Sequence, residues 1–89
     1  MQCKVTATIV NRLGLHARPA MTFVDVASTF ASDIKVRRED TEVDGKSIMQ
    51  VMMLAASQGS SLEIVAEGED AQSACDALKK LVDGGFDEE

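Results

Sequence analysis

The chain has 89 residues, of which 45% are hydrophobic and 27% charged, a composition typical of a folded globular domain and not of a disordered chain. Its 15 acidic and 9 basic residues give a net charge of −6, which disfavours nucleic-acid binding because a phosphate backbone requires cations. No signal-peptide pattern precedes the first predicted strand, and no apolar stretch approaches the ~20 residues that span a bilayer. We therefore expect one cytoplasmic domain over residues 1–89, without membrane insertion.

The first half of the chain predicts a strand, a helix and a hairpin. Alternating polar and apolar residues from Lys4 to Ile9 indicate a half-buried strand, followed by turn residues. Apolar residues at steps of three and four from Ala20 to Ala31 predict a helix that begins near Ala17, with Pro19 in its first turn. Strands at 33–38 and 41–43 follow, joined by a turn at Glu39–Asp40.

The second half predicts two helices around one more strand. The expected elements are a helix from Ser47 to about Ser57, a strand over 62–66 and a helix over 71–82. Ser47 and Gln50 match a capping box, in which each side chain bonds an N–H at the helix start. Gly84–Gly85 is expected to end the last helix, and the tail Phe86–Glu89 is expected to be solvated.

The resulting order, β-α-β-β-α-β-α, predicts an α+β fold with a four-stranded antiparallel sheet and helices on one side. The two cysteines, Cys3 and Cys75, form no close-spaced motif, so we expect reduced thiols with a packing role and no zinc site or disulfide framework. The acidic clusters match no calcium loop and are interpreted as solvated surface. No metal or cofactor is expected.

His16 is the single histidine, and it stands between a glycine-containing loop and the start of the first predicted helix. The plainer interpretation is a surface loop residue. The alternative follows from its position, because a helix N-terminus offers unpaired N–H groups and a positive dipole end. This field favours a neutral, nucleophilic imidazole and then stabilises a phosphoryl group attached to it. Ala17 and Arg18 can supply such N–H groups, whereas Pro19 cannot.

Two other residues lie at predicted helix starts. Arg18 is either a solvated charge or an anion clamp, since a cation opposes the helix dipole there but a guanidinium matches phosphate geometry. Ser47 is a good N-cap, and it is equally a candidate phosphorylation site, because a phosphate is tolerated at a helix N-terminus.

The predicted helix after Ser47 is apolar on nearly every side, since only Gln50 and Ser57 interrupt residues 48–57. It is either an unusually well covered core helix or a partly exposed, methionine-rich docking surface. On the second interpretation, the exposed residues are Ile48, Met49, Met52 and Met53. Val51, Leu54 and Ala55 then face inward.

Two motifs in register resemble one known family. The segment Gly14-Leu15-His16-Ala17-Arg18-Pro19-Ala20 resembles the active-site motif of the HPr family, the histidine-containing phosphocarriers of the bacterial phosphoenolpyruvate-dependent phosphotransferase system. Gly45-Lys46-Ser47-Ile48-Met49, followed by Val51-Met52, resembles the regulatory serine segment of that family. The resemblance covers nearly the whole chain.

This resemblance implies an open-faced β-sandwich with three helices on one face of the sheet, and a phosphocarrier protein instead of an enzyme. It implies that His16 accepts a phosphoryl group on Nδ1 from enzyme I and passes it to EIIA-type domains, with Arg18 in contact with the group. Ser47 is then the target of HPr kinase/phosphorylase where the organism has one. The implied docking surface includes Leu15, Ile48, Met49 and Met52, on a protein expected to be monomeric.

The sequence departs from this family in charge. Well-known members carry lysines around the active site, whereas the matching positions here are Asp25, Ser28 and Gln50. Weak electrostatic steering is expected, with recognition resting on the apolar surface or on less acidic partners. A regulatory HPr-like module, of the nitrogen-type relay or a non-catalytic partner-binding kind, is therefore the alternative. It would act through Ile48, Met49 and Met52.

Overall fold

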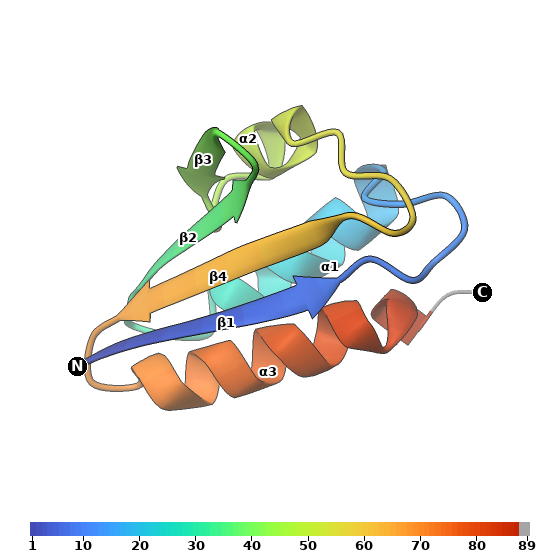
Figure 1. Cartoon of the computed structure of the whole chain (residues 1–89). Coiled ribbons are helices and arrows are strands. Elements are labelled where there is room, and N and C mark those ends of the chain that lie inside the picture. The colour runs from blue at the N-terminus through green and yellow to red at the C-terminus, as the bar shows by residue number, and fades with distance from the viewer. Residues whose placement is uncertain (88–89) are drawn as a thin grey trace.

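The computed structural model describes residues 1–87, and it contains one antiparallel sheet with helices packed on one face (Figure 1). The elements in chain order are β1 (Gln2–Thr8), α1 (Ala17–Ala27), β2 (Asp33–Arg38), β3 (Thr41–Asp44), α2 (Ile48–Met53), β4 (Ser61–Glu67), α3 (Ala71–Asp83) and the short 3₁₀ turn η1 (Gly85–Asp87). This order and the antiparallel sheet confirm the predicted α+β class. Within this part of the chain, no helix is long and apolar enough to cross a bilayer.

The strands lie in the order β1-β4-β2-β3, so the last strand of the chain occupies the interior of the sheet. One cross-strand row carries Val5, Ile64, Val36 and Val43 on the face that the helices cover. The next row places Lys4, Val65, Lys35 and Asp44 on the opposite face. The period-2 pattern of each strand therefore reappears as one apolar and one largely polar surface of the sheet.

The core lies between that apolar sheet face and the helices. Phe23 of α1 and Leu78 of α3 are buried against the strand residues Ile34, Leu62 and Ile64. These residues fall at the positions that the helix and strand periods had marked as apolar. The periodicity of the sequence is therefore enough to identify most core residues without the pairing of the strands.

The helices α1 and α2 both end earlier than predicted. α1 ends at Ala27, and the N–H groups of Thr29 and Phe30 bond to carbonyls three residues back, at 3.1 and 3.2 Å. Phe30 still packs against the core from this turn. α2 ends at Met53, not near Ser57, because Ala55 adopts a positive φ of 49°, which terminates a helix.

The C-terminal tail also differs from the prediction. Gly84 caps α3, as the sequence indicated, but the chain then turns back through η1. The Phe86 side chain is only 5% exposed, so the expectation of a solvated phenylalanine is wrong. A large aromatic side chain is stabilised by burial wherever the turn can reach the core. Glu88 and Glu89, the rest of the predicted tail, lie outside the described residues.

Asp70 joins the start of α3 to the loop between α1 and β2. Its carboxylate accepts hydrogen bonds from the Ala31 N–H at 2.8 Å, from the Ser32 N–H at 3.0 Å and from the Ser32 hydroxyl. The Ser32 hydroxyl, followed by the Ala31 N–H, holds the pKa of this carboxyl below its usual value. The ionised carboxylate thus ties together two loops at the same end of the sheet.

We expect Asp70→Asn to lower the melting temperature at pH 7, because the amide replaces an ionised acceptor of three hydrogen bonds. A lowered folded-state pKa means that this stabilisation is present above the usual pKa of 3.8 and is lost as the pH falls through the lower folded value. The difference in melting temperature from the parent chain should therefore shrink at acid pH. Glu69→Gln, which removes a neighbouring exposed carboxylate, is the control; a pH-independent difference for Asp70→Asn would contradict the assignment.

Candidate active site around His16

His16 occupies the N-cap position of α1, with an extended backbone (φ −82°, ψ −170°) and a half-buried side chain. Its carbonyl accepts the Ala20 N–H at 3.0 Å, the first hydrogen bond of the helix. The imidazole therefore projects from the helix start, as the sequence predicted. Because the helix fixes the His16 backbone, the position of the ring depends on how the preceding loop is held.

That loop is held by two hydrogen bonds at the Gly14–Leu15 peptide. The Asn11 side-chain amide donates to the Gly14 carbonyl at 2.7 Å, and the Leu15 N–H donates to the Ala56 carbonyl at 2.8 Å. Gly14 has a φ of 71°, and a Cβ at this position would lie 2.5 Å from the Ala56 oxygen. Only glycine permits both this conformation and this close approach of the two loops.

The start of α1 is electrostatically suited to an anion. Every residue of α1 is described, and its first turn holds no carboxylate that would neutralise the helix dipole. The amides of Ala17 and Arg18 have no acceptor within the helix, because they precede its first complete turn. Pro19 contributes no N–H and is buried. Two amide donors therefore lie at the helix start next to His16, and Arg18 follows two residues later in the chain.

A shallow depression of about 670 Å³ surrounds His16 on the outer face of α1. Its lining consists of Leu13, His16, Ala17, Arg18, Met21, Thr22 and Asp25. The structure thus brings together His16 and Arg18, the two residues that the sequence placed at this site. Ser47 does not line the depression, although α1 and α2 pack against each other.

Leu13 and Met21 line the same depression but were missed by the sequence reasoning. Leu13 is 68% exposed and Met21 is 50% exposed. Met21 offered a signal, because an apolar residue at that position lies off the buried stripe that contains Ala20 and Val24. Leu15 shows the reverse, since its side chain is only 5% exposed. The expectation that Leu15 contributes to an exposed surface is therefore wrong, because the Leu15 side chain packs into the core while its N–H bonds the Ala56 carbonyl.

The methionine-rich segment divides between core and surface largely as predicted. Val51 and Leu54 are buried, whereas Met49 and Met53 are 79% and 71% exposed. Ile48 and Met52 are about two-fifths exposed, at 38% and 41%. Ala55 was predicted to face inward, but its positive φ turns it outward and Ala56 is buried instead. The exposed residues Ile48, Met49, Met52 and Met53 are called the α2 patch below.

Ser47 caps α2 through half of the predicted capping box. Its hydroxyl accepts the Gln50 N–H at 3.3 Å. The Gln50 side chain, however, accepts the N–H of Asp44 at 2.9 Å instead of the Ser47 N–H, which donates to the Asp44 carbonyl at 3.1 Å. The predicted reciprocal bond from Gln50 to the Ser47 N–H is therefore wrong, because Asp44, the last residue of β3, bonds both groups. Ser47 as a residue is half-buried at the helix start.

Comparison with known proteins adds to this geometry. The sequence model of the family described as "PTS HPr component phosphorylation site" matches residues 3–83. The chain belongs to the HPr family. HPr proteins are phosphocarriers of the phosphotransferase system and not catalytic enzymes.

The relatives span nearly the whole chain. It is 50% identical over 82 residues to phosphocarrier protein HPr of Pseudomonas aeruginosa, with 91% of each chain covered. It is 44% identical over 82 residues to phosphocarrier protein NPr of Proteus mirabilis, again with 91% of each covered. The crystal structure of HPr-C-His from Thermoanaerobacter tengcongensis matches with a TM-score of 0.93, at 46% identity and 98% coverage of both chains. The HPr-like open sheet with three helices on one face is thereby confirmed.

A metal site requires several donor groups close together. Among residues 1–87, no three histidine, cysteine, aspartate or glutamate side chains gather in a way that could hold a metal ion.

Gly14→Ala is expected to destabilise the fold by at least ~2 kcal/mol, because the new Cβ adds a backbone clash to the cost of a positive φ. Gly59→Ala is the matched control. Gly59 also has a positive φ, of 93°, but nothing lies within 4 Å of its Cβ position, so only ~1 kcal/mol is expected. Urea unfolding measures both changes. Equal losses would show that the contact with Ala56 contributes nothing.

Proposed function

We propose that His16 accepts a phosphoryl group on Nδ1 from phosphorylated enzyme I and passes it to an EIIA-type domain. The observation that carries this proposal is the imidazole at the start of α1, next to two helix amides without intrahelical acceptors, in a phosphocarrier family. Transfer forms a bond from the ring nitrogen to phosphorus as the donor's leaving group departs. The amides and the dipole favour the added negative charge, so the phosphorylated form is stabilised but still exchangeable.

Arg18 is proposed to contact the phosphoryl group. It lines the depression with His16 and is exposed, so its guanidinium can turn toward the imidazole without breaking a packed contact. A planar guanidinium can donate two parallel hydrogen bonds to phosphoryl oxygens. No general base or metal is needed in this chain, because the partner proteins supply the catalytic environment.

Partners are proposed to dock on the exposed apolar residues beside His16. These are Leu13 and Met21 together with the α2 patch, and Leu15 is left out because it is buried. Methionine side chains adapt to different surfaces, which suits a carrier that meets a donor and several acceptors in turn. The depression itself holds one cation and one carboxylate, Arg18 and Asp25, so docking should depend little on long-range charge.

Ser47 is proposed as a regulatory phosphorylation site for HPr kinase/phosphorylase where the organism has one. Its hydroxyl lies at the start of α2, directly before Ile48 and Met49 of the α2 patch. A phosphate there is compatible with the helix dipole, but it places two negative charges beside an apolar docking surface. Phosphorylation at Ser47 would therefore weaken docking without unfolding α2.

A regulatory HPr-like module is the second candidate function. The identity of 44% to an NPr protein favours it, as does the absence of lysines from the positions of Asp25, Ser28 and Gln50. Such a module would act through the α2 patch residues Ile48, Met49 and Met52, either in a nitrogen-type relay or by binding a partner without phosphoryl transfer. In both cases we propose that residues 1–89 act as one monomeric domain in the cytoplasm.

His16→Ala separates phosphoryl transfer from docking alone. After incubation with phosphoenolpyruvate and the enzyme I of the same genome, intact-mass spectrometry should show one acid-labile phosphoryl group on the parent chain and none on His16→Ala. Uptake by neither chain, with enzyme I shown to be active, would favour the binding module. Unchanged uptake by His16→Ala would place the acceptor elsewhere.

The same assay tests Arg18. Arg18→Ala should slow the initial rate of phosphoryl uptake roughly 10-fold or more while leaving the melting temperature unchanged, because a hydrogen bond to a charged group contributes about 1.5–3 kcal/mol. Arg12→Ala, which removes an exposed arginine outside the depression, is the matched control. If both variants lose the same rate, Arg18 contributes only general charge.

Ser47→Asp is expected to weaken binding to enzyme I several-fold, measured by titration calorimetry, because it introduces charge next to the α2 patch. Ser73→Asp places the same charge on an exposed position of α3 and should bind as the parent chain does. Unchanged affinity for Ser47→Asp would argue against docking on the α2 patch.

A further inference from the structure

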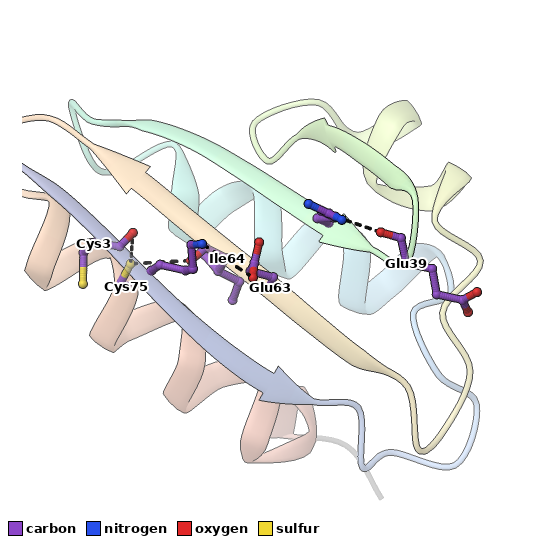
Figure 2. Close-up of polar contacts among 7 residues, drawn as sticks. Cys3, Glu39, Glu63, Ile64 and Cys75 are labelled. Atoms are coloured by element: carbon purple, nitrogen blue, oxygen red, sulfur yellow. Dashed lines mark hydrogen bonds and ion pairs between the residues drawn. The ribbon is translucent and has the colours of Figure 1, made fainter.

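The two cysteines, which are far apart in sequence, meet where α3 packs against β1. Cys3 lies on β1 and Cys75 lies on α3, separated by 72 positions. The Cys75 thiol donates to the Cys3 carbonyl at 3.3 Å, and burial, together with the neighbouring Cys3, raises the pKa of the Cys75 thiol. Figure 2 shows the two side chains together at the boundary between β1 and α3.

Other contacts hold these two elements in register. The Thr8 N–H donates to an oxygen of Asp83 at 3.0 Å, and the Lys79 ammonium donates to the Thr6 carbonyl at 2.8 Å. Lys79 and Asp83 are themselves paired at 2.8 Å. Because α3 is tied to the edge of β1 beyond the cysteines, the two thiols are held close together instead of meeting by chance.

The two thiols differ in their access to solvent. Cys75 is fully buried, whereas Cys3 is partly exposed at the surface and its thiol donates to the side chain of Gln72 at 3.5 Å. A dissolved oxidant can therefore reach Cys3 but not Cys75. Such an arrangement pairs an accessible thiol with a shielded thiol that can react only with its neighbour.

We propose that Cys3 and Cys75 form a redox-active pair that closes to an intramolecular disulfide when the chain meets a hydroperoxide. The Cys3 sulfur, as thiolate, attacks the peroxide and breaks its O–O bond, which gives a Cys3 sulfenic acid and releases an alcohol, or water from hydrogen peroxide. The Cys75 sulfur then attacks the Cys3 sulfur. The S–S bond forms as the S–O bond breaks, and the oxygen leaves as water with the Cys75 proton. Two thiols are oxidised by two electrons and one hydroperoxide is reduced.

The bond would join the first strand to the last helix. Closure of so long a loop restricts the unfolded chain and so raises stability. His16 lies beyond the other end of β1, outside the α3–β1 contact, so the bond leaves its loop untouched. The oxidised chain is expected to take up phosphoryl groups as the reduced chain does. The disulfide would then stabilise the fold under oxidising conditions without inhibiting the carrier.

Closure should become faster at alkaline pH. Burial, followed by the neighbouring Cys3, raises the pKa of the Cys75 thiol to about 11, so Cys75 is protonated near neutral pH. Its thiolate fraction, and with it the rate of attack on the sulfenic acid, should rise about tenfold per pH unit below that value. Dimedone competes for the same sulfenic acid. The ratio of disulfide to dimedone adduct should therefore increase steeply between pH 7 and 9.

The test uses the full reduced chain, treated with hydrogen peroxide and then with iodoacetamide. We expect a monomer that has lost two hydrogens and takes up no iodoacetamide, with a melting temperature higher by roughly 10 °C or more that dithiothreitol reverses. Peptide mapping should show Cys3 linked to Cys75. A parent chain that gains oxygen on Cys3 without loss of two hydrogens, or that forms only disulfide-linked dimers, would overturn the proposal.

Two variants serve as matched controls. Cys75→Ala should stop at the Cys3 sulfenic acid or at an intermolecular disulfide, and Cys3→Ala should leave Cys75 unmodified under the same exposure. Circular dichroism checks the fold of both, and the partly exposed position of Cys3 makes the second variant structurally mild. Oxidation of Cys75 in Cys3→Ala at the parental rate would contradict the assigned roles.

Discussion

The close approach of Gly14 to the backbone of Ala56 and Ser57 determines where the candidate phosphoryl acceptor stands. Since α1 begins directly after this contact, the Leu15–Ala56 hydrogen bond and the positive φ of Gly14 together set the direction in which the helix leaves the loop. His16 then occupies the N-cap position, so its side chain lies at the positive end of the α1 dipole, next to the first amides of the helix. A side chain at Gly14 would separate the two loops and move every group at the site together.

The same contact explains how a small chain presents a large apolar surface. The loop after α2 must reach Gly14, so α2 ends early and Ala55 turns outward through a positive φ. Val51 and Leu54 anchor the helix in the core, while the α2 patch stays in contact with water. Exposed methionines beside a phosphoryl acceptor cost some solubility, but they provide a surface that can adapt to more than one partner.

The local charge at the start of α1 differs from the net charge of the chain. The chain as a whole has a net charge of −6, whereas the start of α1 holds no carboxylate in its first turn and carries Arg18. Locally, the site favours an anion even though the chain as a whole repels one. Binding of a phosphoryl group therefore depends on short-range donors and the helix dipole, which act within a turn of the helix, rather than on long-range attraction.

The sequence by itself determined the element order, most of the core and the placement of His16, Arg18 and Ser47 at helix starts. These properties depend on local periods and on residues adjacent in the chain, such as the alternation in β4 and the stripe that includes Phe23. The buried Leu15, the return of Phe86 to the core and the meeting of Cys3 with Cys75 were decided only by the tertiary structure. Each of these depends on which distant segment packs against the residue. The packing of α3 against β1, for example, is what brings Cys75 to Cys3. Strand order and loop contacts set that choice, and no local pattern encodes them.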